Sequence, residues 1–249
     1  MKISVLTSFY NGDLMIPYFL SHYAYADEII VLFNDHGKPV DGPTEKLILS
    51  YPNTRIEPFD YPHNKTDYVF ATGVLNRAIS KLDCDWAFAV SGDELAFPVG
   101  MRDAKATLQD ADGVVIKACF WNVFRHRDDK DLDPTLPAIW QRRHGWPDRS
   151  GAGCVKPSVF RPAAGVSFGI GSHTCSIPVG RGVESSIRFD GAHWLSADPV
   201  LSIQRRMRGR REMVSKRTLN DGMGSQFFDI TEKAIREQCD SLLDSPQLF

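Results

Sequence analysis

The first half of the chain alternates short apolar runs with longer segments in which apolar residues recur every three or four positions. The apolar runs are rich in β-branched and aromatic residues and predict strands. They span residues 3–9, 27–35, 54–61 and 86–90. The periodic segments predict helices. They span residues 13–26, 42–52 and 66–84. Strands that alternate with helices favour an α/β fold with a mostly parallel central sheet flanked by helices.

The second half of the chain is less regular. Further apolar runs predict strands over 113–121, 155–162, 166–173 and 185–194. The charged stretch 122–137 between them predicts a loop, and two helices are expected over 199–217 and 225–243. No linker separates the halves. We therefore expect one domain over 1–249, with a ligand-binding half at 1–120 and a second half at 121–249 wrapped on it.

Composition narrows the class of protein. The 249 residues are 43% hydrophobic and 24% charged, which is ordinary for a soluble globular protein with a sizeable core. The net charge of −2 gives no general attraction to nucleic acid. Five scattered cysteines without a Cys-x-x-Cys pair indicate reduced thiols in a cytoplasmic protein. No apolar run is long enough to span a membrane, and the N-terminal run is too short for a secretory signal.

Polar residues follow the predicted strands of the first half. Parallel sheets bind ligands at the carboxyl ends of their strands, so we expect these residues to converge there. They are Thr7, Ser8, Asn11, Asn34, Asp35, Asp60, Ser91, Gly92, Asp93 and Glu94.

Asp93 and Glu94 stand out because apolar runs flank them on both sides, over 86–90 and 95–98. A solvated turn is the simplest interpretation. Against it, a chain that stays near the core would bury carboxylates, which is costly unless they are paired. A bound divalent cation is one compensation, since Mg²⁺ and Mn²⁺ prefer carboxylate oxygens and keep positions for substrate phosphates.

The order of three stretches, ISVLTSFYN, DEIIVLFND and DWAFAVSGDELAFP, resembles the family-2-like glycosyltransferases of the GT-A fold. Two later stretches resemble segments of one subgroup, namely VKPSVFRP with GIGSHT over 155–174, and FDGAHWLSADP over 189–199. The chain departs from the family at Ser91, where the motif has its first Asp. The loss of that acid leaves a weaker metal site or none.

The resemblance implies a Rossmann-like nucleotide-binding half and transfer of a sugar from a nucleotide-diphosphate donor to a glycan or lipid-linked acceptor. It implies an inverting enzyme assisted by Mn²⁺ or Mg²⁺. The expected metal ligands are Asp93 and His193, although His193 could instead pack beside Trp194. The expected donor-binding residues are Thr7, Ser8, Asn11, Asn34, Asp35, Asn76, Ser91, Gly92, Asp93, Lys156, Arg205 and Lys216.

The acceptor side and the catalytic base are less defined. Glu94 and Asp148 are both candidates for the base, and the sequence does not choose between them. Trp146 and His173 are expected on the acceptor side. The basic stretch 204–217 allows three interpretations: a solvated helix face, a diphosphate clamp made by Arg205, Arg206 or Lys216, or a surface that docks on an anionic inner leaflet.

Two other functions compete with this hypothesis. A nucleotidyltransferase would also use such a sheet, but it would normally carry a Gly-rich basic loop after the first strand. The stretch TSFYNGD has one Gly and no basic residue. A carbohydrate- or protein-binding module of the same fold that has lost activity is the other alternative, and Ser91 keeps it open. The donor sugar and the oligomeric state are left open.

Overall fold

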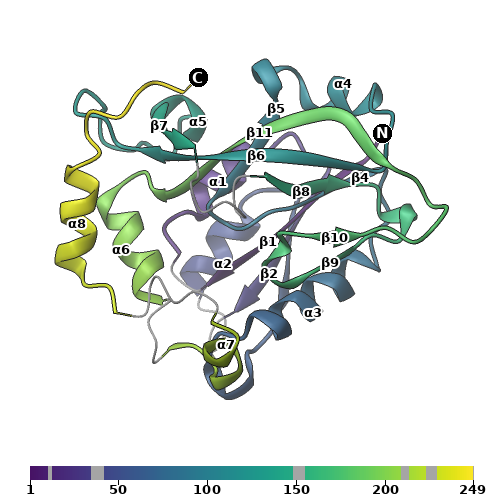
Figure 1. The fold of residues 1–249 in the computed structure, drawn as a ribbon, viewed down its shortest axis with the longest axis horizontal. Coiled ribbons are helices and arrows are strands. Elements are labelled where there is room, and N and C mark those ends of the chain that lie inside the picture. Colours follow the sequence, from purple (N-terminus) through teal and green to yellow (C-terminus); the bar gives the residue numbers. More distant parts are fainter. Residues whose placement is uncertain (11–12, 35–41, 148–154, 209–212, 223–228, 249) are drawn as a thin grey trace.

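The computed structural model describes residues 1–10, 13–34, 42–147, 155–208, 213–222 and 229–248. In this part of the chain a nine-stranded sheet forms the centre of the molecule (Figure 1). Its strands are β1 (Ile3–Tyr10), β2 (Glu28–Asn34), β3 (Thr54–Pro58), β4 (Trp86–Ala89), β5 (Glu94–Pro98), β6 (Val115–Phe124), β7 (His144–Pro147), β8 (Val155–Phe160) and β11 (Glu184–Ser196).

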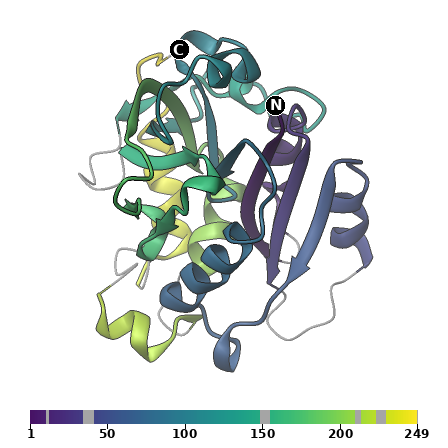
Figure 2. The same cartoon turned by 90° about the vertical axis from the view of Figure 1, so that its right-hand side faces the viewer.

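The strand order is β3-β2-β1-β4-β8-β6-β11-β5, and β7 pairs with β6 outside this path. Strands β1, β2, β3, β4, β6 and β11 run in one direction. Strands β5, β7 and β8 run against them. The prediction of a mostly parallel central sheet is confirmed. The turned view in Figure 2 shows the first-half strands β1 and β2 on one side of the molecule and the second-half strands on the other.

Helices flank the sheet. They are α1 (Ile16–His22), α2 (Gly42–Leu49), α3 (Tyr68–Ile79), α4 (Ala104–Gln109), α5 (Ala138–Gln141), α6 (Pro199–Arg208), α7 (Lys216–Asn220) and α8 (Glu232–Asp240). A short hairpin, β9 (Ser167–Phe168) with β10 (Cys175–Ser176), lies near α3 (Figure 1). None of the described helices is long and apolar enough to cross a membrane.

The apolar residues of the strands divide between two cores because successive side chains point to opposite faces. Val5 and Phe9 of β1 join the core that contains side chains of α1 and α2. Leu6 of the same strand joins the core that contains Val74 of α3 and Phe168 of the hairpin. Both faces of the parallel strands are therefore covered, as their continuous apolar pattern predicts.

The prediction of one basic helix over 199–217 is wrong. Helix α6 ends at Arg208, and Ser215 begins a separate helix by accepting a hydrogen bond from the backbone N–H of Thr218. Val214, just before this cap, forms a bridge with Thr66. The Ser215 cap satisfies a backbone N–H at the start of α7, and the bridge pairs the backbone of Val214 with Thr66. Both interactions hold the chain in a non-helical conformation at Val214 and Ser215.

Three other boundaries also differ from the prediction. The 122–137 loop starts later, because β6 continues to Phe124 while β7 pairs with it. The strand expected over 166–173 is only two residues long, since the chain turns at Gly171 with a φ of 70°. Strand β5 was not expected, and it forms because it pairs with the distant β11.

Candidate functional site

Asp93 and Glu94 lie where the chain turns from β4 into β5. The backbone N–H of Ser91 donates to Glu94 Oε2 at 3.0 Å, which closes this turn. A Cβ at Gly92 would lie 2.4 Å from the Phe9 ring, so only glycine fits against β1 here. The exposed fractions of Asp93 and Glu94 are 5% and 3%. The interpretation of these acids as a solvated turn is therefore wrong.

A guanidinium and an imidazole of the second half converge on one oxygen of Asp93. Arg205 Nε lies 3.1 Å from Asp93 Oδ2, and His193 Nε2 lies 3.4 Å from the same oxygen. The Arg205 guanidinium also reaches Asp13, whose Oδ2 lies 3.0 Å from Arg205 Nη1. Arg205 thus bridges a carboxylate at the end of β4 and one that follows β1.

The sheet itself positions His193. In β11 it lies opposite Glu94 of β5 on one side and opposite Asn122 of β6 on the other. Its Nδ1 lies 2.7 Å from Asn122 Oδ1. If this oxygen accepts from Nδ1, only the imidazolium can also donate from Nε2 to Asp93. The neighbouring residue Trp194 points into the core and stacks on Tyr18.

Glu94 has a separate cationic partner, Lys156 of β8. Lys156 Nζ donates to Glu94 Oε1, and the exposed fraction of the lysine is 9%. The ammonium also lies 5.8 Å from the centre of the Phe120 ring. Burial works to raise the pKa of Glu94, but the charge of Lys156 outweighs it, so the pKa lies below its usual value.

The charges around Asp93 act in the same way. Burial works to raise the pKa of its carboxyl, but the Arg205 charge and the His193 contact outweigh burial, so the pKa is well below its usual value. For Arg205, burial works to lower the pKa, but Asp93 and Asp13 hold it above the usual value. Both groups are therefore fully charged at neutral pH.

Sequence reasoning missed three kinds of residue in this cluster. Asp13 was assigned to the start of a helix and Asn122 to the start of a loop, and each gains its role only through a partner far away in sequence. Tyr68, the first residue of α3, is also near: burial and then Tyr10 raise its pKa to about 12, and the charges of Arg205 and Asp93 act on it too. A local motif could not have shown these contacts.

The residues predicted to bind the base and ribose differ in exposure. Ser8 is exposed between buried neighbours near the carboxyl end of β1. Thr7 and Asn34 are 2% and 1% exposed, and Asn34 Nδ2 donates to the backbone oxygen of Phe59 at 3.0 Å. Asn11 and Asp35 lie outside the described residues.

The structure describes the positions of four other predicted site residues. Their roles in binding stay predictions. Asn76 exchanges two hydrogen bonds of 2.9 Å with the backbone of Phe168, so its amide holds α3 to the hairpin. Lys216 and His173 are exposed, on α7 and after the 3₁₀ turn Ile170–Ser172 respectively. The backbone of Trp146 pairs with Asn122. Asp148 lies outside the described residues.

Arg206 does not belong to the cluster around Asp93. It is 6% exposed and donates from Nη2 to Ser196 Oγ at 2.6 Å and from Nη1 to Gln238 of α8. Its guanidinium therefore joins α6 to α8 and to the end of β11. Of the three basic residues considered as a diphosphate clamp, the structure places Arg205 beside the buried acids.

A divalent cation does not fit this arrangement as it stands. Asp93 Oδ2, the oxygen that faces His193, already has a guanidinium and an imidazole as neighbours. The two oxygens of Glu94 are engaged by Lys156 and by the Ser91 N–H. Within the described ranges no group of three or more His, Cys, Asp or Glu side chains could hold a metal. The metal site at Asp93 and His193 stays a prediction.

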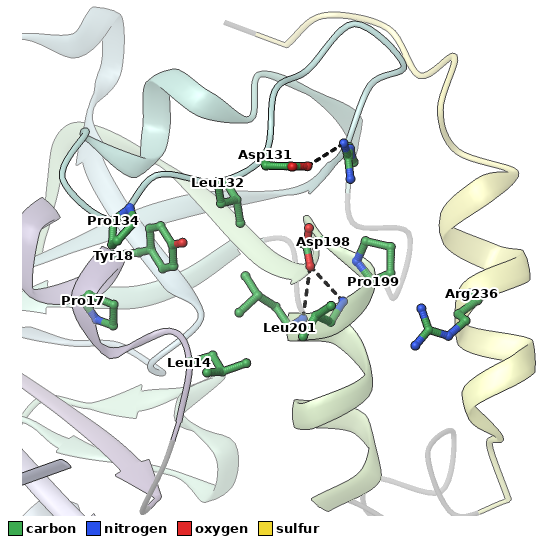
Figure 3. Close-up of a pocket in the computed structure, with 12 residues that line it drawn as sticks. Leu14, Pro17, Tyr18, Asp131, Leu132, Pro134, Asp198, Pro199, Leu201 and Arg236 are labelled. Carbon is green, nitrogen blue, oxygen red and sulfur yellow. Dashed lines mark hydrogen bonds and ion pairs between the residues drawn. The ribbon is translucent and has the colours of Figure 1, made fainter. Parts of the chain in front are cut away.

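A cavity of about 560 Å³ lies beside the other end of α6 (Figure 3). Leu14, Tyr18 and Leu201 contribute apolar lining, while Asp198 accepts hydrogen bonds from the first backbone N–H groups of α6. Figure 3 shows Arg236 of α8 on the opposite side from Tyr18. A ligand in this cavity would contact the same helix that carries Arg205.

Comparisons with known proteins do not assign a family. No family model matches the chain, and no curated protein matches it. Among solved structures, S. aureus TarS 1–349 in complex with UDP-GlcNAc has a TM-score of 0.42 at 14% identity, covering 98% of this chain and 70% of that one. This chain spans 43% of a longer S. aureus TarS structure.

Two further structures are similar over a smaller part of the chain. Glucosyl-3-phosphoglycerate synthase from Mycobacterium tuberculosis, in complex with Mn²⁺, UDP and phosphoglyceric acid, has a TM-score of 0.35 at 13% identity, covering 66% of this chain and 56% of that one. CMP:2-keto-3-deoxy-manno-octonic acid synthetase with CTP has a TM-score of 0.34 at 15% identity, covering 66% and 75%. Likenesses at this level carry no argument about function.

Proposed function

We propose that this chain is a glycosyltransferase that binds a nucleotide-diphosphate sugar at the carboxyl ends of β1, β2 and β4 and transfers the sugar to a glycan or lipid-linked acceptor. The observation that carries the proposal is the buried cluster of charges at the β4–β5 turn. Its carboxylates are Asp13, Asp93 and Glu94, and its basic side chains are Lys156, His193 and Arg205. Ligands of parallel sheets bind at this edge.

Buried charge clusters are costly to fold, which favours a functional reason for this one. Cations that face the edge of the sheet suit a diphosphate, because guanidinium and ammonium groups bind phosphate oxygens with charge-assisted hydrogen bonds. We place the nucleoside beside Ser8, whose side chain is exposed near the end of β1. The second half, with the cavity beside α6, would then receive the acceptor.

Transfer breaks the bond between the sugar C1 and the diphosphate oxygen and forms a bond from C1 to the acceptor hydroxyl oxygen. The nucleoside diphosphate leaves with the electron pair, and the hydroxyl proton passes to a base. Glu94 and Asp148 remain the candidates for that base. Because both Glu94 oxygens have partners, Lys156 would have to release it before it could accept a proton.

Calorimetry with a panel of UDP-, GDP-, CDP- and ADP-sugars tests the proposal, followed by chromatography of the products. We expect one donor to bind and its nucleoside diphosphate to be released when acceptor is added. Asp93→Asn should abolish release, while Arg188→Met on the exposed start of β11 serves as a matched control. Release of pyrophosphate from a nucleoside triphosphate would instead identify a nucleotidyltransferase.

A further inference from the structure

The buried cluster at the β4–β5 turn contains its own cations. Arg205 bridges Asp93 and Asp13, His193 faces Asp93, and Lys156 pairs with Glu94. Counted over the described residues, three carboxylates meet three basic side chains. A divalent cation needs carboxylate oxygens that are free to bind it, and here Asp93 Oδ2 and both oxygens of Glu94 already have partners.

Arg205 has the properties of a permanent counter-ion. A guanidinium stays charged under all physiological conditions, and its planar fork can bind two acceptors in fixed directions. Here the fork holds one oxygen from each of two acids at 3.0 and 3.1 Å. Its side chain retains 17% exposure, whereas the Asp13 and Asp93 side chains retain 0% and 7%. The His193 side chain retains 20% exposure, so the more accessible members of the cluster are the basic side chains rather than the acids.

The change at residue 91 agrees with this arrangement. The sequence at the turn reads Ser91-Gly92-Asp93-Glu94, with a serine where the motif that it resembles has its first acid. The Ser91 backbone N–H instead donates to Glu94. Glu94 is thus paired to Lys156, while Arg205 contacts Asp93 at 3.1 Å, closer than the 3.4 Å from His193.

We propose that Arg205 is the resident cation of the Asp93 site and binds the donor diphosphate without a divalent metal. The proposal rests on the proposed function, since it names how the same site holds the donor. Phosphate oxygens would contact the guanidinium while Asp13 and Asp93 hold it in place from behind. Metal binding at Asp93 and His193 would require Arg205 to leave.

The first experiment measures Mn²⁺ alone, by electron paramagnetic resonance, on wild type, Arg205→Met and Arg188→Met. Arg188 is the matched control, because it is also an arginine paired to an acid, Glu184, but it is exposed and lies at the start of β11. We expect no bound Mn²⁺ in wild type or in the control, and binding in Arg205→Met. Wild-type Mn²⁺ binding that disappears in Asp93→Asn would overturn the proposal.

The second experiment measures the affinity for UDP, GDP, CDP and ADP by calorimetry, with EDTA or with Mn²⁺. In wild type we expect the tightest-binding nucleotide to have the same affinity in both conditions. Arg205→Met should weaken it roughly ten- to a hundredfold in EDTA, as expected for a lost charge-assisted contact. Arg205→Lys, which keeps the charge, should lose less and guards against a variant that fails to fold.

The outcomes separate this inference from the proposed function. Wild-type binding that tightens by roughly tenfold or more with Mn²⁺ would overturn the metal-free proposal and leave the glycosyltransferase proposal standing. Failure of all four nucleotides to bind in either condition would overturn both. Equal nucleotide affinity in wild type and in Arg205→Met would overturn the role of Arg205 in binding phosphate.

Discussion

The two halves of the chain contribute opposite charges to the same buried place. The first half contributes acids, Asp13 after β1 and Asp93 and Glu94 after β4. The second half contributes the bases, which are Lys156 on β8, His193 on β11 and Arg205 on α6. Figure 1 shows β8 and β11 in the same sheet as β1 and β4, so the irregular half completes the regular one.

Because the acids come from one half and the basic side chains from the other, neither set could stay buried and charged without the other. Desolvating an ion costs several kcal/mol, about what its partner returns in good geometry. An acid cluster without its bases would take up protons or water instead of staying buried as anions. The site and the contact between the halves are therefore the same physical feature, and changes at the site should affect stability as well as binding.

The largest effect is expected for Asp93→Ala. It removes the carboxylate between Arg205 and His193 and leaves both cations with less compensation in a buried place. Removing one partner of a buried ion pair typically costs about 3–5 kcal/mol of the free energy of unfolding. We expect a loss in this range by urea denaturation, together with the loss of nucleoside diphosphate binding.

Asp93→Asn is the control for shape, because it removes the charge and keeps a similar volume. It should lose most of the same stability if charge is the cause. Wild-type stability in both variants would show that Asp93 does not hold the two halves together.

The second effect concerns Lys156 and Glu94, which join β8 of the second half to β5 of the first. Lys156→Met should cost about 3 kcal/mol, since it leaves Glu94 buried without its cation. Glu94→Gln in the same chain should recover much of that loss, because the neutral side chain needs no cation and can still accept from the Ser91 N–H. A double-mutant cycle in urea measures the coupling between the two residues. Losses that simply add would mean the pair does not join the halves.

The first half could largely be predicted because its signals are local. The strands and helices up to Val90 each follow from a run of apolar residues and a nearby turn or cap; for example, Asp67 accepts from the Phe70 backbone N–H and begins α3, as an N-cap should. Asp93 could be chosen for the same reason. Its apolar flanks are visible in the sequence, and both it and Glu94 are buried.

The residues that contact Asp93 could not be predicted from local sequence signals. Arg205 is one of seven basic residues between 204 and 217, and nothing near it shows that it reaches Asp13 and Asp93. The contact depends on where α6 packs, which long-range strand pairing of β11 decides. Asn76 shows the same limit, because its two hydrogen bonds to the Phe168 backbone join residues that are 92 positions apart in the sequence.

The third effect concerns the pH dependence of stability. It separates the contribution of His22, inside the first half, from that of Asp93 and Glu94, which contact the second half. His22 of α1 donates from Nε2 to the backbone oxygen of Ala96 at 3.0 Å, and burial lowers its pKa from 6.5 to about 4. The unfolded chain therefore binds a proton in this pH range while the folded chain does not. Stability should fall by about 2.5 kcal/mol as the pH drops from about 6.5 to 4.

The lowered pKa values of Asp93 and Glu94 give stability that is present above their ordinary values of 3.8 and 4.5 and is lost only as the pH falls further. The two windows can thus be told apart by urea denaturation at a series of pH values. His22→Gln should flatten the slope above pH 4.5 and keep the acid limb below it. An unchanged slope in this variant would assign the upper window to another group.

The smallest effect is expected at a neutral contact between the halves. Asn76 of α3 exchanges two hydrogen bonds with the Phe168 backbone, so Asn76→Ala should leave that backbone unpaired and cost about 1–2 kcal/mol. Ser80→Ala at the C-terminal cap of the same helix is the matched control, since its hydroxyl donates to the nearby Arg77 backbone oxygen. The measurement is urea unfolding beside nucleoside diphosphate affinity for each variant. If Asn76 acts only as a joint, stability should fall and affinity should stay the same, because neither partner contacts the cluster of charges. A variant that keeps its stability and loses affinity would instead place Asn76 at the donor, as the sequence predicts.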